Sequence, residues 1–588
     1  MAHRSGGIII TLGTNRDPAA DDTLATADPA TGDEPEHALP LDQMLIQAAL
    51  GTAGRWLPGR SGVRFLDALA KHPDRVTARL GGLVDELGRI AKGTSTVAPH
   101  RKDRRFADPA WSANPLLRRV VQAYLATAAT AEGLVADAPL EWRDAERMRF
   151  VVSNLVEAAA PSNNPLISPV AWKAFLESSG SNTIAGPRNL VGDFASSPRI
   201  PTMVEPDAFA VGVDLAITPG AVVYRAPMFE LIQYMPQTDT VRDVPLLIVP
   251  PTINKYYVLD LAPGRSLIEY LVQQGQQVFV ISWRNPDERH SDWGVDAYAA
   301  AVLAAFDVVH RISGAPSVHT LAACSGGLIT ALAAGHRAAT GGLGPLASMS
   351  LLVTMIDQNR AGVVGSLIDE GIARAAIARS ARKGYLDGRH LAEVFAWIRP
   401  GDLVWNYWVN NYLQGKPPPK FDILFWNADT TRMPAALHRD FIEAAVGNKL
   451  ATPGAVSVLG TPVDLGAITV DSYIVAGSAD HICPWRNCYR SAGLFGGKVR
   501  FVLSTNGHIA ALVNPPGNAK AGYQVSEDTS LDPAAWRAAA ATAKGSWWPD
   551  YAAWLGDRSG PDRPAPTTLG NAEFRPLGTA PGTYVMDR

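Results

Sequence analysis

The stretch LAACSGGLIT, residues 321–330, combines a cysteine with small residues at a spacing that could support nucleophilic chemistry. Ala322 lies two positions before Cys324, and Gly326 lies two positions after it. A nucleophile that points out of a sharp strand-to-helix turn needs small neighbours there, because the backbone folds tightly around it. The backbone N–H of Ser325, at the expected helix start, could donate to an oxyanion, and the helix N-terminus would favour a thiolate. The alternative interpretation is a structural cysteine in a strand-to-helix turn.

Two further residues follow Cys324 in the order that α/β-hydrolase sites use, which is nucleophile, acid and histidine. Asp480 comes directly after the apolar run 473–476, and His508 comes directly after the run 499–503. If both runs are parallel strands, all three side chains lie at the carboxyl edge of one sheet. The order and spacing therefore favour Cys324 as nucleophile, Asp480 as acid and His508 as base.

The remaining histidine and cysteine candidates are weaker. His481 neighbours Asp480, so the two side chains would point apart in an extended turn. Cys483 and Cys488 lack small neighbours of the elbow kind, and we interpret them as residues that pack around a helix start. Because the Cys and His residues show no paired ligand spacing, we expect no metal site.

The elements that must position these residues are strands and helices in alternation from about residue 210. Helix-length segments separate the apolar runs 244–251, 276–283, 317–323, 347–357, 469–478 and 498–505. Short buried strands that alternate with helices indicate a mostly parallel sheet covered by helices on both faces, the α/β-hydrolase fold. Ile253 or Asn254, just after the first run, is a candidate second oxyanion donor. The alternative is an ordinary strand-to-loop turn.

The rest of the chain divides by composition. Residues 1–40 are rich in Asp, Ala, Thr and Pro, and we expect a disordered leader. Helical periodicity indicates a mainly helical domain over 41–205, whose part 161–205 is broken by Pro, Asn, Ser and Gly and predicts a long connection. The catalytic domain is expected over 206–588, with an aromatic-rich insertion at about 357–466 that has the size of a cap or lid.

Composition excludes several function classes for this chain of 588 residues. The formal net charge of −3 comes without a basic stripe, so a nucleic-acid partner is not expected. Three cysteines give no disulfide framework and fit a reducing cytoplasm. No run of about 18 apolar residues indicates a transmembrane span, and no secretory signal is recognisable.

Several motifs, taken together, resemble the polyhydroxyalkanoate synthases. They are PPTINKYYVLDL, VFVISWRNPD, ACSGG, GDLVWNYWVNNYL, FDILFWNADTTRMP, GSADHICPW and NGHIAALVNPPGN, with TLGN and APGTYV near the end. The resemblance extends from about residue 105 to the C-terminus. It is greatest to the type II, medium-chain-length enzymes, while INKYYVLDL is shared with the short-chain type I enzymes.

The resemblance implies a reaction and a set of residues. The nucleophile, acid and base of the family fall on Cys324, Asp480 and His508. The substrate would be an (R)-3-hydroxyacyl-CoA and the products a polyester and free CoA, without a metal or a bound cofactor. The family elbow usually begins with Gly, whereas this chain has Ala322, which is small enough for the turn. A cytoplasmic homodimer that associates with polymer granules through its N-terminal region is also implied.

Two features of the expected mechanism stay open at this point. Asp480 could orient His508, or it could help activate the 3-hydroxyl group that attacks the next thioester. The aromatic residues of the insertion could form a lid that closes over Cys324 and contacts substrate, or they could form the insertion's own core. They are Trp397, Trp405, Tyr407, Trp408, Phe425 and Trp426. Ile509 and Ala510, beside the base, and residues 353–355 could line the acyl pocket.

Two other functions are weighed against the same sequence features. A cysteine-dependent thioesterase or esterase of this fold would need the same three residues and would differ only in using water as the acceptor. A catalytically silent granule-coating protein would have no chemical need for Cys324, Asp480 and His508 together.

Overall fold

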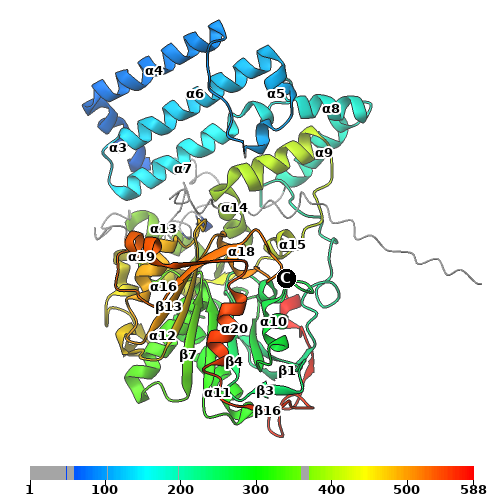
Figure 1. Ribbon diagram of the computed structural model, residues 1–588, viewed down its shortest axis with the longest axis vertical. Helices are drawn as coiled ribbons and strands as arrows, with labels where there is room; N and C mark the ends of the chain where they lie inside the picture. Colours follow the sequence, from blue (N-terminus) through cyan, green and yellow to red (C-terminus); the bar gives the residue numbers. More distant parts are fainter. Residues whose placement is uncertain (1–44, 46–47, 50–58, 102, 196–197, 359–369) are drawn as a thin grey trace, which may run out of the picture.

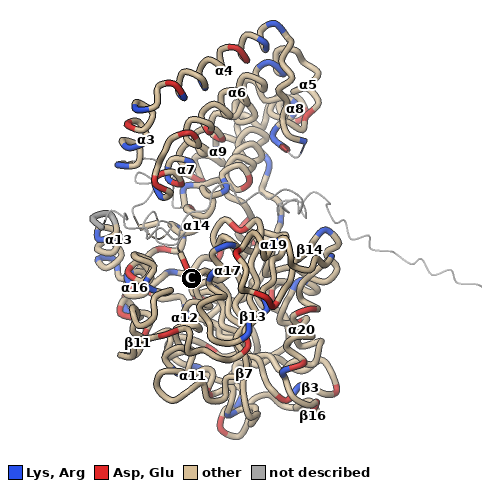
Figure 2. The backbone as a smooth tube through the Cα atoms, turned by 60° about the vertical axis from the view of Figure 1, so that its left-hand side comes forward, with Lys and Arg blue, Asp and Glu red and all other residues tan. Residues whose placement is uncertain are grey.

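The computed structural model describes residues 45, 48–49, 59–101, 103–195, 198–358 and 370–588. The expected disordered leader, 1–40, lies outside these residues. Figure 1 shows one group of helices, α3 to α9, stacked above a larger body that contains the sheet. Within the described ranges, no helix has both the length and the apolar character needed to cross a bilayer. Figure 2 shows that Lys and Arg positions alternate with Asp and Glu positions along the backbone of both parts rather than gathering in one stripe.

The N-terminal part is helical, as its periodicity predicts. Its helices are α3 (Gly59–Lys71), α4 (Pro73–Lys92), α5 (Ala110–Ala113), α6 (Pro115–Asp137), α7 (Trp142–Ala158), α8 (Pro169–Glu177) and α9 (Asn182–Ala195). Helix α4 ends at Gly93, whose φ of 73° suits glycine. The prediction that 161–205 is only a connection is wrong, because this segment contains α8 and α9. Pro169 is the first residue of α8, where proline is tolerated because its missing N–H needs no helical partner.

The central sheet has the order β15-β14-β13-β12-β7-β6-β4-β5-β2-β1-β17. The strands from β5 to β13 in this order are parallel, and antiparallel strands extend both edges. The bounds are β1 (Gly220–Arg225), β2 (Phe229–Tyr234), β4 (Leu246–Val249), β5 (Val278–Trp283), β6 (Val318–Ala323), β7 (Leu346–Leu352), β12 (Ser472–Gly477), β13 (Val499–Ser504), β14 (Gly522–Ser526), β15 (Ala541–Lys544) and β17 (Gly578–Thr579). Each predicted run from 244 to 505 overlaps one of the parallel strands, although β7 begins one residue before its run.

Helices accompany the strands and cover the sheet. They are α10 (Leu267–Gln273), α11 (Val295–Ser313), α12 (Ser325–Gly341), α17 (Trp485–Ala492), α18 (His508–Leu512), α19 (Pro533–Ala539) and α20 (Trp548–Gly556). Strands β4, β5, β6 and β12 are buried along their whole length, as expected for parallel strands with helices on both faces.

The elements between β7 and β12 include α13 (Glu370–Lys383), α14 (Gly388–Ile398), two π-helical turns (Gly401–Trp405 and Trp408–Leu413), α15 (Asp422–Ala428) and α16 (Ala435–Ala445). Of these, α14 and α15 lie between the sheet and the N-terminal helices (Figure 1). Helix α9 contacts the second turn directly, since the Asn182 side-chain amide donates to the Leu413 carbonyl at 2.9 Å. The predicted domain boundaries, including the insertion at 357–466, stay predictions.

Candidate active site

Cys324 occupies a strained turn between β6 and α12. Its φ of 51° and ψ of −121° lie in a region that non-glycine residues rarely adopt. The Cys324 backbone N–H donates to the Leu352 carbonyl at 3.0 Å, which ties the turn to the end of β7. The residue therefore has the strand-turn-helix context that the sequence motif predicts for a nucleophile.

The two glycines that follow Cys324 are required by close contacts with other segments. A Cβ atom at Gly326 would lie 2.4 Å from the Pro250 carbonyl oxygen, and one at Gly327 would lie 2.1 Å from Thr354 Oγ1. Ala322 is fully buried in β6. The start of α12 can thus approach the loop after β4 and Thr354 only when positions 326 and 327 carry no side chains.

We expect Gly326→Ala to misplace the elbow. Overpacking against the Pro250 carbonyl should destabilise the fold by about 1–3 kcal/mol, and displacement of Cys324 should lower activity about a hundredfold. Gly341→Ala is the matched control, because this glycine ends the same helix and nothing lies within 4 Å of an added Cβ. Thermal unfolding and turnover check both variants. Equal behaviour of the two would contradict this account of the elbow.

Asp480 and His508 form a buried hydrogen-bonded pair. His508 Nδ1 lies 2.7 Å from Asp480 Oδ2, and the Asp480 side chain is fully buried. The other carboxylate oxygen, Oδ1, accepts the backbone N–H groups of Ile482 and Cys483, both at 2.8 Å. Because a carboxylate accepts from Nδ1–H, the second ring nitrogen, Nε2, is left for the nucleophile.

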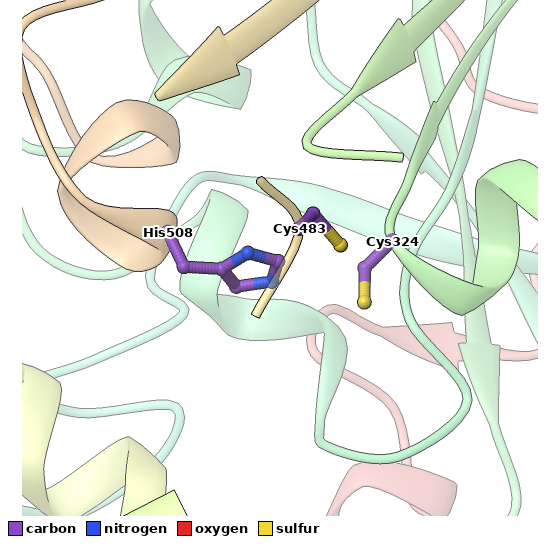
Figure 3. Close-up of side chains that lie close together, drawn as sticks. All are labelled: Cys324, Cys483 and His508. Carbon is purple, nitrogen blue, oxygen red and sulfur yellow. The ribbon is translucent and has the colours of Figure 1, made fainter. Parts of the chain in front are cut away.

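The nucleophile and base lie close enough to exchange a proton. The sulfur atoms of Cys324 and Cys483 and a ring nitrogen of His508 all lie within 4.8 Å of one another (Figure 3). A hydrogen bond from Cys483 lowers the pKa of Cys324. This effect exceeds the opposite effect of burial, and contact with His508 lowers the pKa further. Burial opposes the imidazolium, but the charge and hydrogen bond of Asp480 outweigh it and raise the pKa of His508 to about 10. These shifts favour a thiolate–imidazolium pair at neutral pH.

Cys483 is a residue of the site that the sequence motifs did not predict. We interpreted it as a packing residue, but its sulfur lies beside that of Cys324, and it lines the same cavity. It reaches the site because its loop folds around the Asp480 carboxylate, which accepts the Cys483 backbone N–H, and no sequence pattern specifies that arrangement. Cys488 is buried, as expected for packing, and all three cysteines are free thiols. His481 also lines the cavity, but Asp480 is hydrogen-bonded to His508.

The predicted oxyanion residues come together beside Cys324. Ser325, Ile253 and Asn254 all line the cavity. The Ser325 backbone N–H hydrogen-bonds to Cys324. The Ser325 hydroxyl accepts the Thr252 backbone N–H at 2.9 Å, which fixes the loop after β4 against the start of α12.

A cavity of about 200 Å³ opens onto the nucleophile, and its wall is mostly apolar. Of the residues predicted to contact substrate, Tyr407, Trp426, Ile509 and Ala510 line it, as does Met355. Residues from α14 and α15 complete the wall, so the insertion covers Cys324. Movement of this cover stays a prediction. The same wall contains the polar residues Arg399, Asp402 and Asn427, which no sequence motif had indicated.

The other predicted aromatic contacts lie elsewhere. Trp397, Trp405 and Trp408 do not line this cavity and instead pack against one another, with ring centroids 6.2 and 5.5 Å apart along the series. The Trp408 indole also donates to the Asn163 carbonyl at 3.2 Å, and Phe425 packs on Phe209. These side chains thus pack on one another and on neighbouring segments rather than at the cavity.

The described residues contain one group of thiol and imidazole atoms close enough to be considered for a metal, the same Cys324, Cys483 and His508. The spacing of Cys and His residues along the sequence could not predict this group, because three separate loops contribute its members. We do not assign these residues as ligands, since a cation there would engage the sulfur that must attack.

Comparison with known proteins places this geometry in context. Residues 102–271 match the family model described as the N-terminus of poly-beta-hydroxybutyrate polymerase (PhaC), and residues 245–515 match that of the alpha/beta hydrolase fold. Poly(3-hydroxyalkanoate) polymerases 1 and 2 of Ectopseudomonas oleovorans are 46% and 44% identical to the chain, over 86% and 94% of it and 90% and 98% of their own lengths. The poly(3-hydroxyalkanoate) polymerase subunit PhaC of Cupriavidus necator is 38% identical over 91% of the chain and 93% of its own length. The fold is thus the predicted α/β-hydrolase fold.

Proposed function

Because the chain belongs to the poly(3-hydroxyalkanoate) polymerase family, we propose that it converts (R)-3-hydroxyacyl-CoA thioesters into polyester and free CoA through an acyl intermediate on Cys324. It is an enzyme of the acyltransferase class. The observation that carries the mechanistic proposal is the Cys324, His508 and Asp480 arrangement at an apolar cavity. The arrangement supports this chemistry because each of the three groups can take a defined role in acyl transfer.

In the first step, the Cys324 thiolate attacks the carbonyl carbon of the bound thioester. The Ser325 backbone N–H is placed to stabilise the oxyanion, and a second donor would come from Ile253 or Asn254. The carbon–sulfur bond to CoA then breaks, and imidazolium His508 protonates the departing CoA thiolate. A thiolate suits this exchange, because the acyl group passes between sulfur atoms of similar leaving ability.

In the second step, the 3-hydroxyl group of a further acyl unit attacks the carbonyl carbon of the Cys324 thioester. Its proton passes to His508, and the carbon–sulfur bond breaks so that the thiolate of Cys324 leaves. Asp480 is poorly placed to take that proton itself. One carboxylate oxygen contacts the His508 ring, the other accepts two backbone N–H groups, and the side chain is fully buried. These contacts support the role of orienting His508 over direct activation of the 3-hydroxyl.

The test is to give purified protein (R)-3-hydroxybutyryl-CoA and (R)-3-hydroxydecanoyl-CoA separately, and to measure CoA release and the product. We expect insoluble polyester, with the faster substrate showing the preferred chain length. Release of only free hydroxy acid would instead make the protein a thioesterase. No release from either substrate would favour the silent coat protein.

We also propose that turnover needs no metal or cofactor, because thiolate, imidazole and backbone donors already supply nucleophile, proton transfer and oxyanion stabilisation. Dialysis against a strong chelator should leave the rate of CoA release unchanged. A loss that added Zn²⁺ restores would contradict this proposal.

We propose that the N-terminal helices bind the granule surface. Along α8 and α9, Leu176 and Ile184 are 74% and 76% exposed, and Trp172 is half exposed. Large apolar side chains grouped in this way are typical of an interaction surface. A cytoplasmic location follows from this proposal, since polymer granules form there.

The double variant Leu176→Ser with Ile184→Ser should reduce the fraction of protein that sediments with polyester granules several-fold, because it removes apolar contact area. The matched control is Val213→Ser with Leu577→Ser. These residues are 72% and 55% exposed but belong to other parts of the chain. If both double variants lose granule association equally, granule binding does not depend specifically on the surface of α8 and α9.

We propose a homodimer as the active form, as the family resemblance implies. Sedimentation velocity over a range of protein concentrations, with activity measured in parallel, tests it. Full activity of a species that stays monomeric would contradict it.

A further inference from the structure

We propose that Cys483 is a second catalytic thiol, whose S–H group donates a hydrogen bond to the sulfur of Cys324 whenever that sulfur carries negative charge. The inference rests on the proposed function and deepens it, because it assigns a group that stabilises the nucleophile. Neither the elbow motif nor the triad includes this residue.

The geometry places the two thiols side by side at the cavity. Their sulfur atoms and a ring nitrogen of His508 lie within 4.8 Å of one another, and Figure 3 shows the Cys483 side chain extending toward Cys324. Cys483 is 6% exposed, so water competes little for this contact. In a site of low dielectric, a donor aimed at a charged sulfur is worth more than it would be in water.

The backbone of Cys483 is fixed on both sides. Its N–H donates to Asp480 Oδ1 at 2.8 Å, and its carbonyl accepts the thiol of Cys488 at 3.5 Å. The loop that positions the acid therefore also positions this thiol, without needing a further element.

The contact between the two thiols shifts their pKa values in opposite directions. The hydrogen bond from Cys483 lowers the pKa of Cys324, whereas the same contact and burial raise the pKa of Cys483 well above its ordinary value. Cys483 therefore stays protonated where Cys324 is a thiolate. It can donate to the charged sulfur, but it does not compete with Cys324 as a nucleophile.

A donor at this position would act in both half-reactions. Before acylation, it stabilises the attacking thiolate. During chain transfer, the 3-hydroxyl oxygen bonds to the carbonyl carbon, its proton passes to His508, and the carbon–sulfur bond to Cys324 breaks. The electron pair of that bond returns to the Cys324 sulfur, where the Cys483 S–H stabilises the leaving thiolate.

The test compares Cys483→Ala, which removes the donor, with Cys483→Ser, which keeps one. The readout is the pH dependence of Cys324 alkylation by iodoacetamide, followed by peptide mass spectrometry in the presence of a chelator. We expect the alanine variant to shift the midpoint upward by about one to two pH units, and to lower the rate of CoA release about ten- to a hundredfold. The serine variant should recover at least half of the shift.

Cys488→Ser is the matched control. Cys488 is buried and lies in the same region, but it is not part of the group of three close atoms, and serine keeps a donor to the Cys483 carbonyl. An unchanged midpoint in Cys483→Ala, or an equal shift in Cys483→Ala and Cys483→Ser, would overturn the proposal. A shift in Cys488→Ser equal to that in Cys483→Ala would also overturn it.

Two further variants cover the case in which Cys483→Ala does not fold. Cys483→Thr and Cys483→Val have nearly the same shape and differ in one donor, so a lower midpoint in the threonine variant supports the proposal and equal midpoints overturn it. The alkylation midpoint requires no polymer. If the unmutated protein makes none, the proposed function fails while the inference about the two thiols is still decided.

Discussion

Cys324→Ala is expected to abolish both CoA release and polymer formation, down to the level measured without protein. The remaining groups can bind substrate and hold an oxyanion, but no other thiolate is placed to attack the thioester. Cys483 is not expected to take over. The hydrogen bond with Cys324 that raises its pKa is lost in this variant, but burial, the next cause, still disfavours its thiolate. CoA release is measured continuously with a thiol reagent, and polymer is weighed or stained.

The control for folding is Cys488→Ala, which removes a buried thiol outside the group of three close atoms. It should keep most of the activity at unchanged temperature of unfolding. Cys324→Ser should also fold, yet lose most of the rate, because a hydroxyl is far harder to ionise than this thiol. Substantial polymer from Cys324→Ala would show that the nucleophile is another residue.

Asp480→Asn is expected to lower the turnover number about a thousand- to ten-thousandfold, by analogy with the loss of the acid in other nucleophile–histidine–acid sites. The carboxamide can turn its NH₂ group toward His508 Nδ1, which stabilises the wrong tautomer. It also removes the charge that raises the pKa of His508.

The same variant should change the pH dependence of Cys324 alkylation. Without the carboxylate, the pKa of His508 falls from about 10, so imidazolium is lost at lower pH. Without imidazolium beside it, the thiolate loses a stabilising charge and the pKa of Cys324 rises. The pH range in which the Cys324 thiolate and the His508 imidazolium coexist therefore becomes smaller, because its lower limit rises and its upper limit falls.

Asp471→Asn is a suitable control for this experiment, because its carboxylate pairs with Arg558 rather than with His508. The turnover numbers of both variants are compared at a temperature at which thermal unfolding shows both to be folded. A turnover number for Asp480→Asn within tenfold of the unmutated protein would contradict the role of Asp480 in orienting the base.

The grouping of Cys324, Asp480 and His508 could be predicted from sequence because each one follows a strand with a clear apolar run. Parallel strands bring their carboxyl ends to one edge of the sheet, so chain order alone places Cys324, Asp480 and His508 near one another. The close approach of α12 to β4 also left a local trace, since it requires Gly326. Fold and triad thus follow from local patterns plus topology.

Other parts of the site left no such trace. Which aromatic residues face the cavity depends on two π-helical turns, where the usual helical period fails. Tyr407 faces the cavity while Trp405 and Trp408, on either side of it, pack elsewhere. Cys483 enters the site only because its loop curls around the Asp480 carboxylate, a tertiary arrangement that residue types and spacing do not specify.

The most direct test of the central claim is to identify the acylated residue. Protein is mixed with less than one equivalent of (R)-3-hydroxyacyl-CoA, quenched in acid within milliseconds, digested and mapped by mass spectrometry. The account predicts a hydroxyacyl or short oligomer adduct on the peptide that contains Cys324, and none on that peptide in Cys324→Ala. Release of CoA with Cys324 unmodified, and the adduct on Cys483 or another residue, would contradict it.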